Sequence, residues 1–318
     1  APSVVDLNGG EAGENFSATF TEDGSAANVA AIAGATITDA DGDNIQSMTV
    51  TLTNRFDGND TESLSLNSTA QTAAIGLTVT YTSSTGVLNI NGAASAATYQ
   101  QILRGVVYNN TSQSPDDTSR QIEIVVNDGA SNSTTRTAAI AVDAVNDAPV
   151  LDAGQSPTLV AIDEDSSAPA NGSTAGSTLV SALASGISDV DTGAAQGIAV
   201  TGTNGVEGSL WYSTDNGTTW TQGPSVSANS ALLLNATARL YWQPGANKNG
   251  TANDAVSFRA WDQSSGSNGG TADTSSNGGT SAFSTITDTV AVMVNAVNDA
   301  PTGEITLSGN AQVGSTLS

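Results

Sequence analysis

A six-residue sequence recurs at a long separation in this chain. Residues 144–149 read Ala-Val-Asn-Asp-Ala-Pro, and residues 296–301 repeat them in the same order. Ala1-Pro2 matches the end of the same sequence, so that the intervals from Pro2 to Pro149 and from Pro149 to Pro301 are 147 and 152 residues. Solenoid repeats are usually about 20–50 residues long, so a repeat of this size is a whole domain. The sequence therefore predicts two tandem domains, residues 1–149 and 150–301, and the start of a third at 302–318.

The hydrophobic pattern within each repeat has the period of a β-strand. Short apolar or alternating runs are bounded by Gly, Asn and Ser clusters, and many such runs with turns every ~8–12 residues are typical of antiparallel β-sandwiches. The fold class expected is therefore all-β. Only residues 95–104 and 178–183 favour a helical turn or two. The predicted strands include residues 48–52, 77–81, 87–90, 122–126 and 139–142 in the first repeat, and 198–200, 232–234, 256–261 and 290–294 in the second.

The composition excludes several kinds of chemistry. The chain has no Cys and no His, which rules out a thiol nucleophile, a Ser-His-Asp triad, an ordinary zinc site and a disulfide framework. Its 318 residues carry 31 Asp and Glu against 7 Lys and Arg, for a net charge of −24. This balance leaves no basic patch for nucleic acid or an anionic membrane, and no apolar stretch is long enough to cross a bilayer. Carboxylate chemistry is what remains.

The acidic residues recur in the same order in both repeats, each group beside the expected end of a strand. Such groups supply the oxygen ligands that calcium prefers, whereas magnesium keeps more of its own water. Asp and Asn also favour turns without any metal, and that interpretation would suffice for a single Asp-x-Asp. The groups are Glu22-Asp23, Asp39-Ala-Asp41-Gly-Asp43, Asp128 and Asp143-Ala-Val-Asn146-Asp147, followed by Asp163-Glu164-Asp165, Asp189-Val-Asp191, Asp262 and Asn298-Asp299.

The Asp39-Ala-Asp41-Gly-Asp43 group is not an EF-hand. The sixth and twelfth positions of such a loop would be Asn44 and Val50, where an EF-hand requires Gly and Glu.

These motifs resemble the cadherin-like tandem repeats of large bacterial surface adhesins of the RTX class, which are secreted by the type I route. Asn-Asp-Ala-Pro linkers, an early acidic pair and an Asp-x-Asp in units of about 150 residues carry the resemblance, which covers both complete repeats and residues 302–318. It implies cadherin-like or Ig-like sandwiches joined end to end by short calcium-binding linkers. The Ca²⁺ ligands expected from the acidic groups and the resemblance are Glu22, Asp39, Asp41, Asp128, Asp143, Asn146, Asp147, Glu164, Asp189, Asp191, Asp262, Asn298 and Asp299.

The resemblance assigns the first junction to Asn146, Asp147, Asp189 and Asp191 with an acidic residue of the first repeat, for which Glu22 is the candidate. The second junction departs from this pattern, because Asn295 stands where the first repeat has Asp143.

Two other features admit a different function. Residues 213–220 fit the Asp-box pattern Ser-x-Asp-x-Gly-x-Thr-Trp, which occurs in sialidase propellers but is itself an element that closes a turn. All four Trp lie in the second repeat, where they either pack in the core or stack on a sugar or peptide. A glycosidase with paired carboxylates is disfavoured, because most of these Asp pairs are too close in sequence to flank a sugar. We therefore do not expect an enzyme.

The function expected from the sequence is that of a calcium-dependent extender in an extracellular adhesin of the bacterial cell surface. Calcium would tie neighbouring repeats of the same chain together and stiffen the linker between them. The partners expected are these neighbouring repeats, with cell-surface glycans or proteins as further ligands, and neither nucleic acid nor membrane insertion. The alternative is a calcium-assisted module that binds a glycan or peptide through the Trp and Tyr of the second domain.

Overall fold

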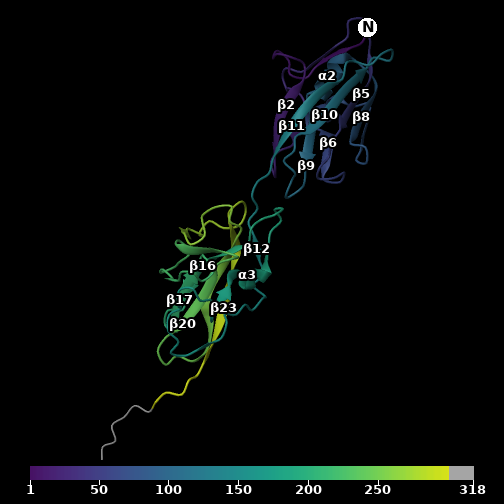
Figure 1. The fold of residues 1–318 in the computed structure, drawn as a ribbon. Coiled ribbons are helices and arrows are strands. Elements are labelled where there is room, and N and C mark those ends of the chain that lie inside the picture. The colour runs from purple at the N-terminus through teal and green to yellow at the C-terminus, as the bar shows by residue number, and fades with distance from the viewer. Residues whose placement is uncertain (301–318) are drawn as a thin grey trace, which may run out of the picture. The chain divides into compact units, whose positions relative to one another are not determined.

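The structure, a computed structural model, describes residues 1–300. Its contacts divide into two compact units, which are visible as separate groups of strands in Figure 1. Unit 1 comprises residues 1–150, 188–195 and 276–284, and unit 2 comprises residues 151–187, 196–275 and the described chain from 285 onward. Two segments of the second repeat, 188–195 and 276–284, therefore belong to unit 1. The stretch 302–318, expected to begin a third repeat, lies outside the described residues.

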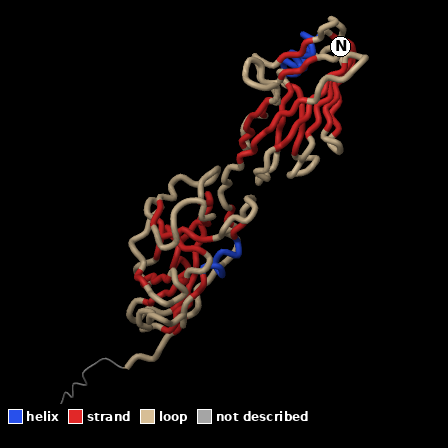
Figure 2. The backbone as a smooth tube through the Cα atoms, turned by 45° about the horizontal axis from the view of Figure 1, so that its top comes forward, coloured by secondary structure: helices blue, strands red, loops and turns tan. Residues whose placement is uncertain are grey.

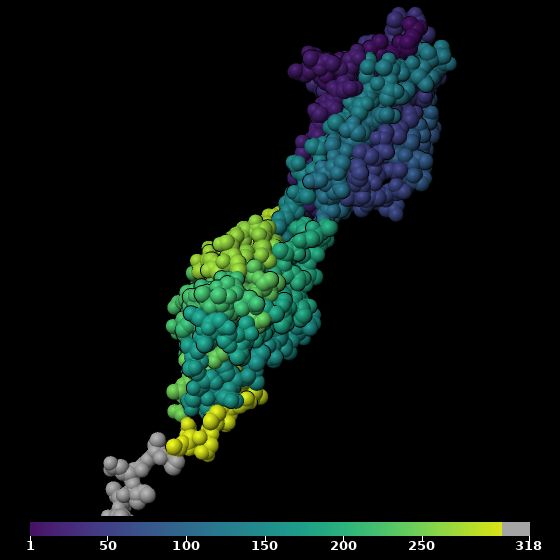
Figure 3. All heavy atoms as spheres, viewed as in Figure 1, coloured from purple at the N-terminus to yellow at the C-terminus, as the bar shows by residue number. Residues whose placement is uncertain are grey.

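Unit 1 is a β-sandwich, as the hydrophobic pattern predicts. Its larger sheet has the order β2 (Phe16–Thr21), β11 (Arg136–Asp143), β10 (Arg120–Asn127), β5 (Ile45–Leu52), β8 (Val87–Ala94) and β7 (Thr78–Thr82). The smaller sheet has the order β3 (Ala27–Asn28), β9 (Val106–Asn110) and β6 (Glu62–Leu66), and β1 (Val4–Asp6) pairs with β4 (Thr36–Thr38). Figure 2 shows strands in red as the dominant elements. The first residues of the chain, dark purple in Figure 3, include an exposed loop at 10–15.

Unit 2 contains the second sandwich, and three of its strands extend into segments assigned to unit 1. The six-stranded sheet has the order β13 (Ile162–Asp163), β23 (Phe283–Asn295), β21 (Gly250–Trp261), β16 (Gly197–Thr203), β19 (Ala231–Asn235) and β22 (Thr271–Ala272). The four-stranded sheet has the order β14 (Thr178–Leu179), β20 (Arg239–Pro244), β17 (Gly208–Ser213) and β18 (Thr221–Gln222), and β12 (Val150–Leu151) pairs with β15 (Ile187–Ser188). Every strand predicted from the sequence is confirmed by one of these elements, although the strand expected at 77–81 is β7 and begins one residue later, at Thr78.

Each sandwich departs from a purely antiparallel arrangement at one edge. β2 pairs in parallel with β11, with Thr21 opposite Asp143, and β13 pairs in parallel with β23, with Asp163 opposite Asn295. Parallel partners end at the same edge of a sheet. The residue that follows β2 therefore lies beside the chain that leaves β11, and this pairing positions the acidic residues described below.

The helices are few and short. α2 (Ala96–Leu103) and α3 (Val180–Leu183) confirm the two expected helical segments, and the 3₁₀ turn η1 (Ala184–Gly186) follows α3. α1 (Ser68–Ala73) was not expected, because its leading Asn-Ser-Thr reads as a turn. The Asn67 side chain caps α1 by accepting from Ala70 N, and the Ala70 side chain is fully buried. Among residues 1–300, no helix has the length and apolar character needed to cross a bilayer.

The Trp side chains of unit 2 differ in burial, and most of them belong to its core. Trp242 and Trp261 are 1% exposed and Trp220 is 8% exposed, whereas Trp211 is partly buried with its Nε1 donating to Gln243 Oε1. Burial of large rings is what stabilises a sandwich core. The structure thus supports the core interpretation for three of the four Trp, because a ring that stacks on a sugar or peptide would need to be exposed.

The Asp-box closes a turn, as its pattern indicates. Asp215 Oδ1 accepts from Thr219 N at 2.9 Å and from Ser213 Oγ at 2.8 Å, and Gly217 has φ of +87°. A residue with a side chain would be strained at this φ. Trp220 then packs inward, and its Nε1 donates to the carbonyl of Ser173. The motif is therefore accounted for by local structure.

The burial of the Trp rings predicts unequal effects of their removal. Trp242→Ala should lower the free energy of unfolding of unit 2 by about 3–5 kcal/mol, because it leaves a cavity, and Trp211→Ala should cost clearly less. Urea unfolding followed by the fluorescence of the remaining Trp measures this difference, because all four Trp lie in unit 2. Equal losses for the two variants would contradict the core assignment.

Candidate metal centre

The parallel pairing of β2 with β11 brings Glu22 against the Asn-Asp-Ala-Pro segment. Glu22 N donates to the carbonyl of Asp143 at 3.0 Å, and Glu22 Oε2 accepts from Val145 N at 2.8 Å. Glu22 is therefore held in place by two hydrogen bonds, one through its backbone amide and one through a carboxylate oxygen. Asp23 follows with φ of +55°, a conformation that Asp adopts more readily than most residues, and the chain turns back there through Gly24 N and Thr21 O.

The Asp-x-Asp turn of segment 188–195 lies in the same unit. Asp191 N donates to Asp189 Oδ1 at 2.9 Å, which closes the turn, and Asp191 Oδ2 accepts from Asp147 N at 2.8 Å. Asn146 Nδ2 donates to the carbonyl of Asp147 at 3.0 Å. We call Glu22, Asp23, Asp147, Asp189 and Asp191 the linker site.

Within residues 1–300, no hydrogen-bond donor reaches a buried carboxylate oxygen on each of two side chains of the linker site. These oxygens are Glu22 Oε1 and Asp147 Oδ2, and Glu22 as a whole is only 4% exposed. Among residues 1–300, no ion pair reaches either side chain. A buried carboxylate oxygen without a partner is costly, because it loses its water and gains nothing in return. These oxygens are therefore suited to a hard cation.

The like charges of the linker site act on one another. Burial raises the pKa of Glu22 above 4.5, and the charges of Asp147, Asp191 and Asp23 raise it further. Burial likewise raises the pKa of Asp147, with Asp191, Asp23 and Asp189 adding to the effect. These shifts show that the five carboxylates lie close enough to repel, so that a divalent cation at this place would relieve the repulsion.

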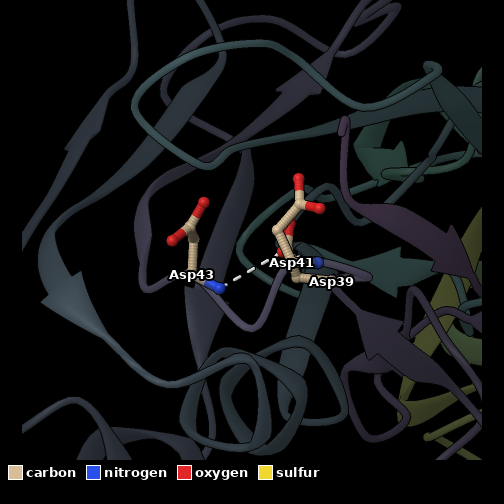
Figure 4. A group of neighbouring side chains, drawn as sticks. All are labelled: Asp39, Asp41 and Asp43. Carbon is tan, nitrogen blue, oxygen red and sulfur yellow. Dashed lines mark hydrogen bonds between the residues drawn. The ribbon is translucent and has the colours of Figure 1, made fainter.

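A second acidic group lies at the opposite end of the larger sheet of unit 1. Because β10 and β11 are antiparallel, Asp128 directly after β10 and Asp143 at the end of β11 lie at opposite ends of the sheet. Ligand oxygens of Asp39, Asp41 and Asp43 lie within 4.8 Å of one another, and Figure 4 shows Asp43 N donating to Asp39.

This second group is better satisfied within the protein than the linker site is. Asp39 Oδ1 accepts from Asp41 N and Asp43 N, and Asp39 Oδ2 accepts from Ser3 Oγ. These bonds, the Ser3 bond foremost, lower the pKa of Asp39. The N-terminal ammonium group contacts Asp41. The carboxylate of Asp128, whose Oδ1 accepts from Ala130 N and Ser131 N, is held in the same way.

Unit 2 repeats the backbone geometry of the linker site with different side-chain chemistry. Glu164 N donates to the carbonyl of Asn295, and Glu164 Oε1 accepts from Val297 N, as Glu22 does with Asp143 and Val145. The other oxygen, Glu164 Oε2, accepts from Asn249 Nδ2 at 2.8 Å. This amide bond, ahead of the Val297 bond, lowers the pKa of Glu164, whereas the pKa of Glu22 is raised.

The expected ligands thus fall into separate places. Glu22, Asn146, Asp147, Asp189 and Asp191 come together in unit 1, and the carbonyl of Asp143 joins them through Glu22 although its side chain is exposed. Asp39, Asp41 and Asp128 lie at the other end of that unit. In unit 2, Glu164 lies beside the segment of Asn298 and Asp299, where Asn298 Nδ2 donates to the carbonyl of Asp299. Asp262 follows β21, and its Oδ1 accepts from Ser264 N.

Three residues at these sites are not among the expected ligands. Asp23 and Asp43 stand within the acidic groups of the sequence, and the turn that follows Glu22 is the signal that places Asp23 at the linker site. Asn249 carries no such signal, because its contact with Glu164 joins residues 85 positions apart.

Comparison with known proteins gives limited likenesses. No protein-family model matches the chain. It is 38% identical over 104 residues to Halomucin of Haloquadratum walsbyi, and the match covers 30% of this chain and 1% of that protein's length.

Solved structures similar to this one include cadherin extracellular domains. Protocadherin Gamma B2 domains 3–6 give a TM-score of 0.36 at 11% identity, covering 94% of this chain and 52% of that one. Mouse clustered PcdhgC3 EC1-3 gives 0.34 at 12% identity, covering 93% and 68%. TM-scores this low leave the function to be argued from the chain's own residues.

The raised pKa values predict how the linker site affects stability without metal. A carboxyl group whose folded pKa is raised contributes stability below its unfolded pKa, and this contribution is lost as the pH rises through the folded value. In calcium-free buffer at pH 7, Glu22→Gln should therefore raise the melting temperature, and its advantage over the wild type should shrink as the pH falls toward 4.5.

Circular-dichroism melts at several pH values measure this difference. Glu123→Gln, which neutralises an exposed carboxylate on β10, is the matched control and should change little. A lower melting temperature for Glu22→Gln than for the wild type at pH 7 would contradict the electrostatic account.

Proposed function

We propose that this chain is part of an extracellular adhesin in which calcium at the linker site joins successive β-sandwich repeats, residues 1–149 and 150–301. The observation that carries the proposal is the pair of buried carboxylate oxygens, Glu22 Oε1 and Asp147 Oδ2, that lack a hydrogen-bond donor among like charges. Calcium takes six to eight oxygen ligands from carboxylates, carbonyls and water, which is the kind of donor present here.

The residues that would hold the ion come from three segments of the chain. Glu22 and Asp23 follow the first long strand of the repeat, Asn146 and Asp147 belong to the Asn-Asp-Ala-Pro segment, and Asp189 and Asp191 come from the following repeat. When bound, calcium supplies positive charge and a fixed centre for these oxygens. The three segments would then be constrained together, and the proline-containing linker would lose freedom to reorient.

The repeat organisation supports an extender role. The same backbone geometry around Glu22 recurs around Glu164, where Asn298 and Asp299 repeat Asn146 and Asp147. A tandem array of domains tied by calcium at junctions like the linker site would project a ligand-binding region from the cell surface. A third repeat beginning at 302, a bacterial cell surface and RTX-type secretion belong to the same proposal, which rests on the resemblance of the sequence motifs.

The absence of Cys fits this proposal, because the chain has no disulfide with which to brace its domains. Extracellular modules bind calcium with a dissociation constant on the order of 10⁻⁴–10⁻³ M, which matches a compartment where calcium is abundant. The neighbouring repeats are the proposed partners of each domain, and surface glycans or proteins would bind elsewhere in the full-length protein.

Calcium should stabilise the chain and restrict its conformations. About 10 mM calcium at a site of this affinity should add about 1–3 kcal/mol to the free energy of unfolding. Small-angle scattering should show a narrower distribution of interatomic distances with calcium than in chelator. Profiles and melting curves that do not differ between the two conditions would rule out the extender mechanism.

Replacement of Asp189 and Asp191 should separate the linker from the folds. Asp189→Asn with Asp191→Asn should abolish the effect of calcium on the scattering profile, because the amides cannot replace the carboxylate charge, and both sandwiches should remain folded. Asp152→Asn with Asp254→Asn, which removes two charges elsewhere, is the control and should respond to calcium as the wild type does. A calcium response that survives in the first variant would place the ion elsewhere.

A further inference from the structure

Unit 1 contains a buried ion network that the sequence does not reveal. The Arg120 side chain is fully buried, with Nε donating to Glu62 Oε2 at 2.7 Å and Nη2 to Asp57 Oδ2 at 2.6 Å. Tyr108 Oη also donates to Glu62 Oε2, at 2.8 Å. Replacing such a buried network with apolar residues is often neutral or stabilising, so stability alone does not account for it.

The network fixes the loop between β9 and β10, residues 111–119. Arg120 Nη1 donates to the carbonyl of Asp116 at 2.9 Å and also to the carbonyl of Thr118. Asp57 Oδ1 accepts from Asp116 N at 2.8 Å, and Asp57 Oδ2 accepts from Asn110 Nδ2 at the start of the loop. The loop is therefore held at both of its ends by the same charged groups.

The middle of this loop contacts two parts of the linker site through hydrogen bonds. Gln113 Nε2 donates to Asp23 Oδ1 at 2.8 Å. Ser114 Oγ accepts from Thr192 N at 2.9 Å and lies 3.1 Å from Thr192 Oγ1. Thr192 directly follows Asp191 in the chain. One loop thus contacts a carboxylate of the Glu22 turn and the backbone of the Asp189–Asp191 turn.

We propose that Arg120 is a positioning residue for the linker site. By fixing the 111–119 loop, it holds Gln113 and Ser114 where they orient Asp23 and the Asp191-Thr192 backbone toward a shared cation. Groups that orient metal ligands in this way commonly change metal affinity by about 10–100-fold when they are removed. The inference rests on the proposed calcium site and identifies the part of unit 1 that orients its ligands.

Unit 2 lacks this network at the corresponding place. When Asp262 is matched with Asp128, the residue that stands for Arg120 is Asp254, which is exposed. In unit 2 the carboxylate equivalent to Glu22 has its second oxygen bound by Asn249 instead. The buried Arg120 therefore occurs in unit 1, where the linker site keeps carboxylate oxygens available to bind a cation.

The test uses variants that leave the ion network in place. Gln113→Ala with Ser114→Ala, made in a chain whose Asp39, Asp41 and Asp43 are changed to Asn, is titrated with calcium by calorimetry. The affinity should fall by about 10-fold or more, while the melting temperature in chelator changes by less than about 2 °C. Ser84→Ala with Gln101→Ala, two exposed positions in unit 1, is the control and should bind calcium normally.

Hydrogen exchange tests Arg120 itself without calcium. Arg120→Lys keeps the charge but loses the fork that holds the loop, so that the Thr192 amide should exchange at least about 10-fold faster. The amide of Ile122, in the middle of the sheet, should be unchanged. Should Arg120→Lys fail to fold, the Thr192 amide is measured in Ser114→Ala, where the same acceleration is expected.

The outcomes separate this inference from the proposed function. Normal calcium affinity in the Gln113/Ser114 variant, beside clear binding by the parent chain, would overturn the positioning role and leave the calcium site standing. An unchanged Thr192 amide would overturn it as well. No calcium binding by the parent chain would overturn the proposed function, and with it the purpose assigned to the loop.

Discussion

The parallel pairing of β2 with β11 is the constraint on which the linker site depends. An antiparallel partner would have placed the residue after β2 at the far end of the sheet. The parallel register instead sets Thr21 opposite Asp143, so that Glu22 bonds to the chain that leaves the domain. The pairing of β13 with β23 repeats this in unit 2 and sets Glu164 beside Val297. One edge of each sandwich thus determines where an acidic residue meets the segment that leads to the next repeat.

The net charge of −24 has a different meaning once the carboxylates are placed. Asp39, Asp128 and Glu164 accept hydrogen bonds that lower their pKa values, so their charges are compensated by the protein. Glu22 and Asp147 are the reverse case, because burial and their neighbours raise their pKa values. Glu22 and Asp147 therefore place unfavourable charge at the linker site. Calcium bound there would make the protein less negative and take over part of the bracing that disulfides provide elsewhere.

Local patterns in the sequence predicted the all-β fold, the longest strands and two helical segments, but the predicted strands did not include β2, β17 or β20. They missed α1, because packing of Ala70 rather than propensity forms it, and they missed the parallel edge, because alternation is the same in parallel and antiparallel strands. The acidic groups were visible as motifs, and a resemblance grouped Glu22 with Asp147, Asp189 and Asp191. The contacts of Asn249 and Arg120 were not visible, because they join residues that only the tertiary fold brings together.

Glu22 and Asp147 are the proposed ligands of a calcium ion, whereas both carboxylate oxygens of Glu164 already accept hydrogen bonds from the protein. Equilibrium dialysis with radioactive calcium measures the number of ions bound by the intact chain and by single variants. We expect Glu22→Gln and Asp147→Asn each to lose at least one bound ion relative to the wild type, and Glu164→Gln to retain the wild-type number. Equal binding by the wild type and the Glu22 and Asp147 variants would contradict calcium binding at the linker site.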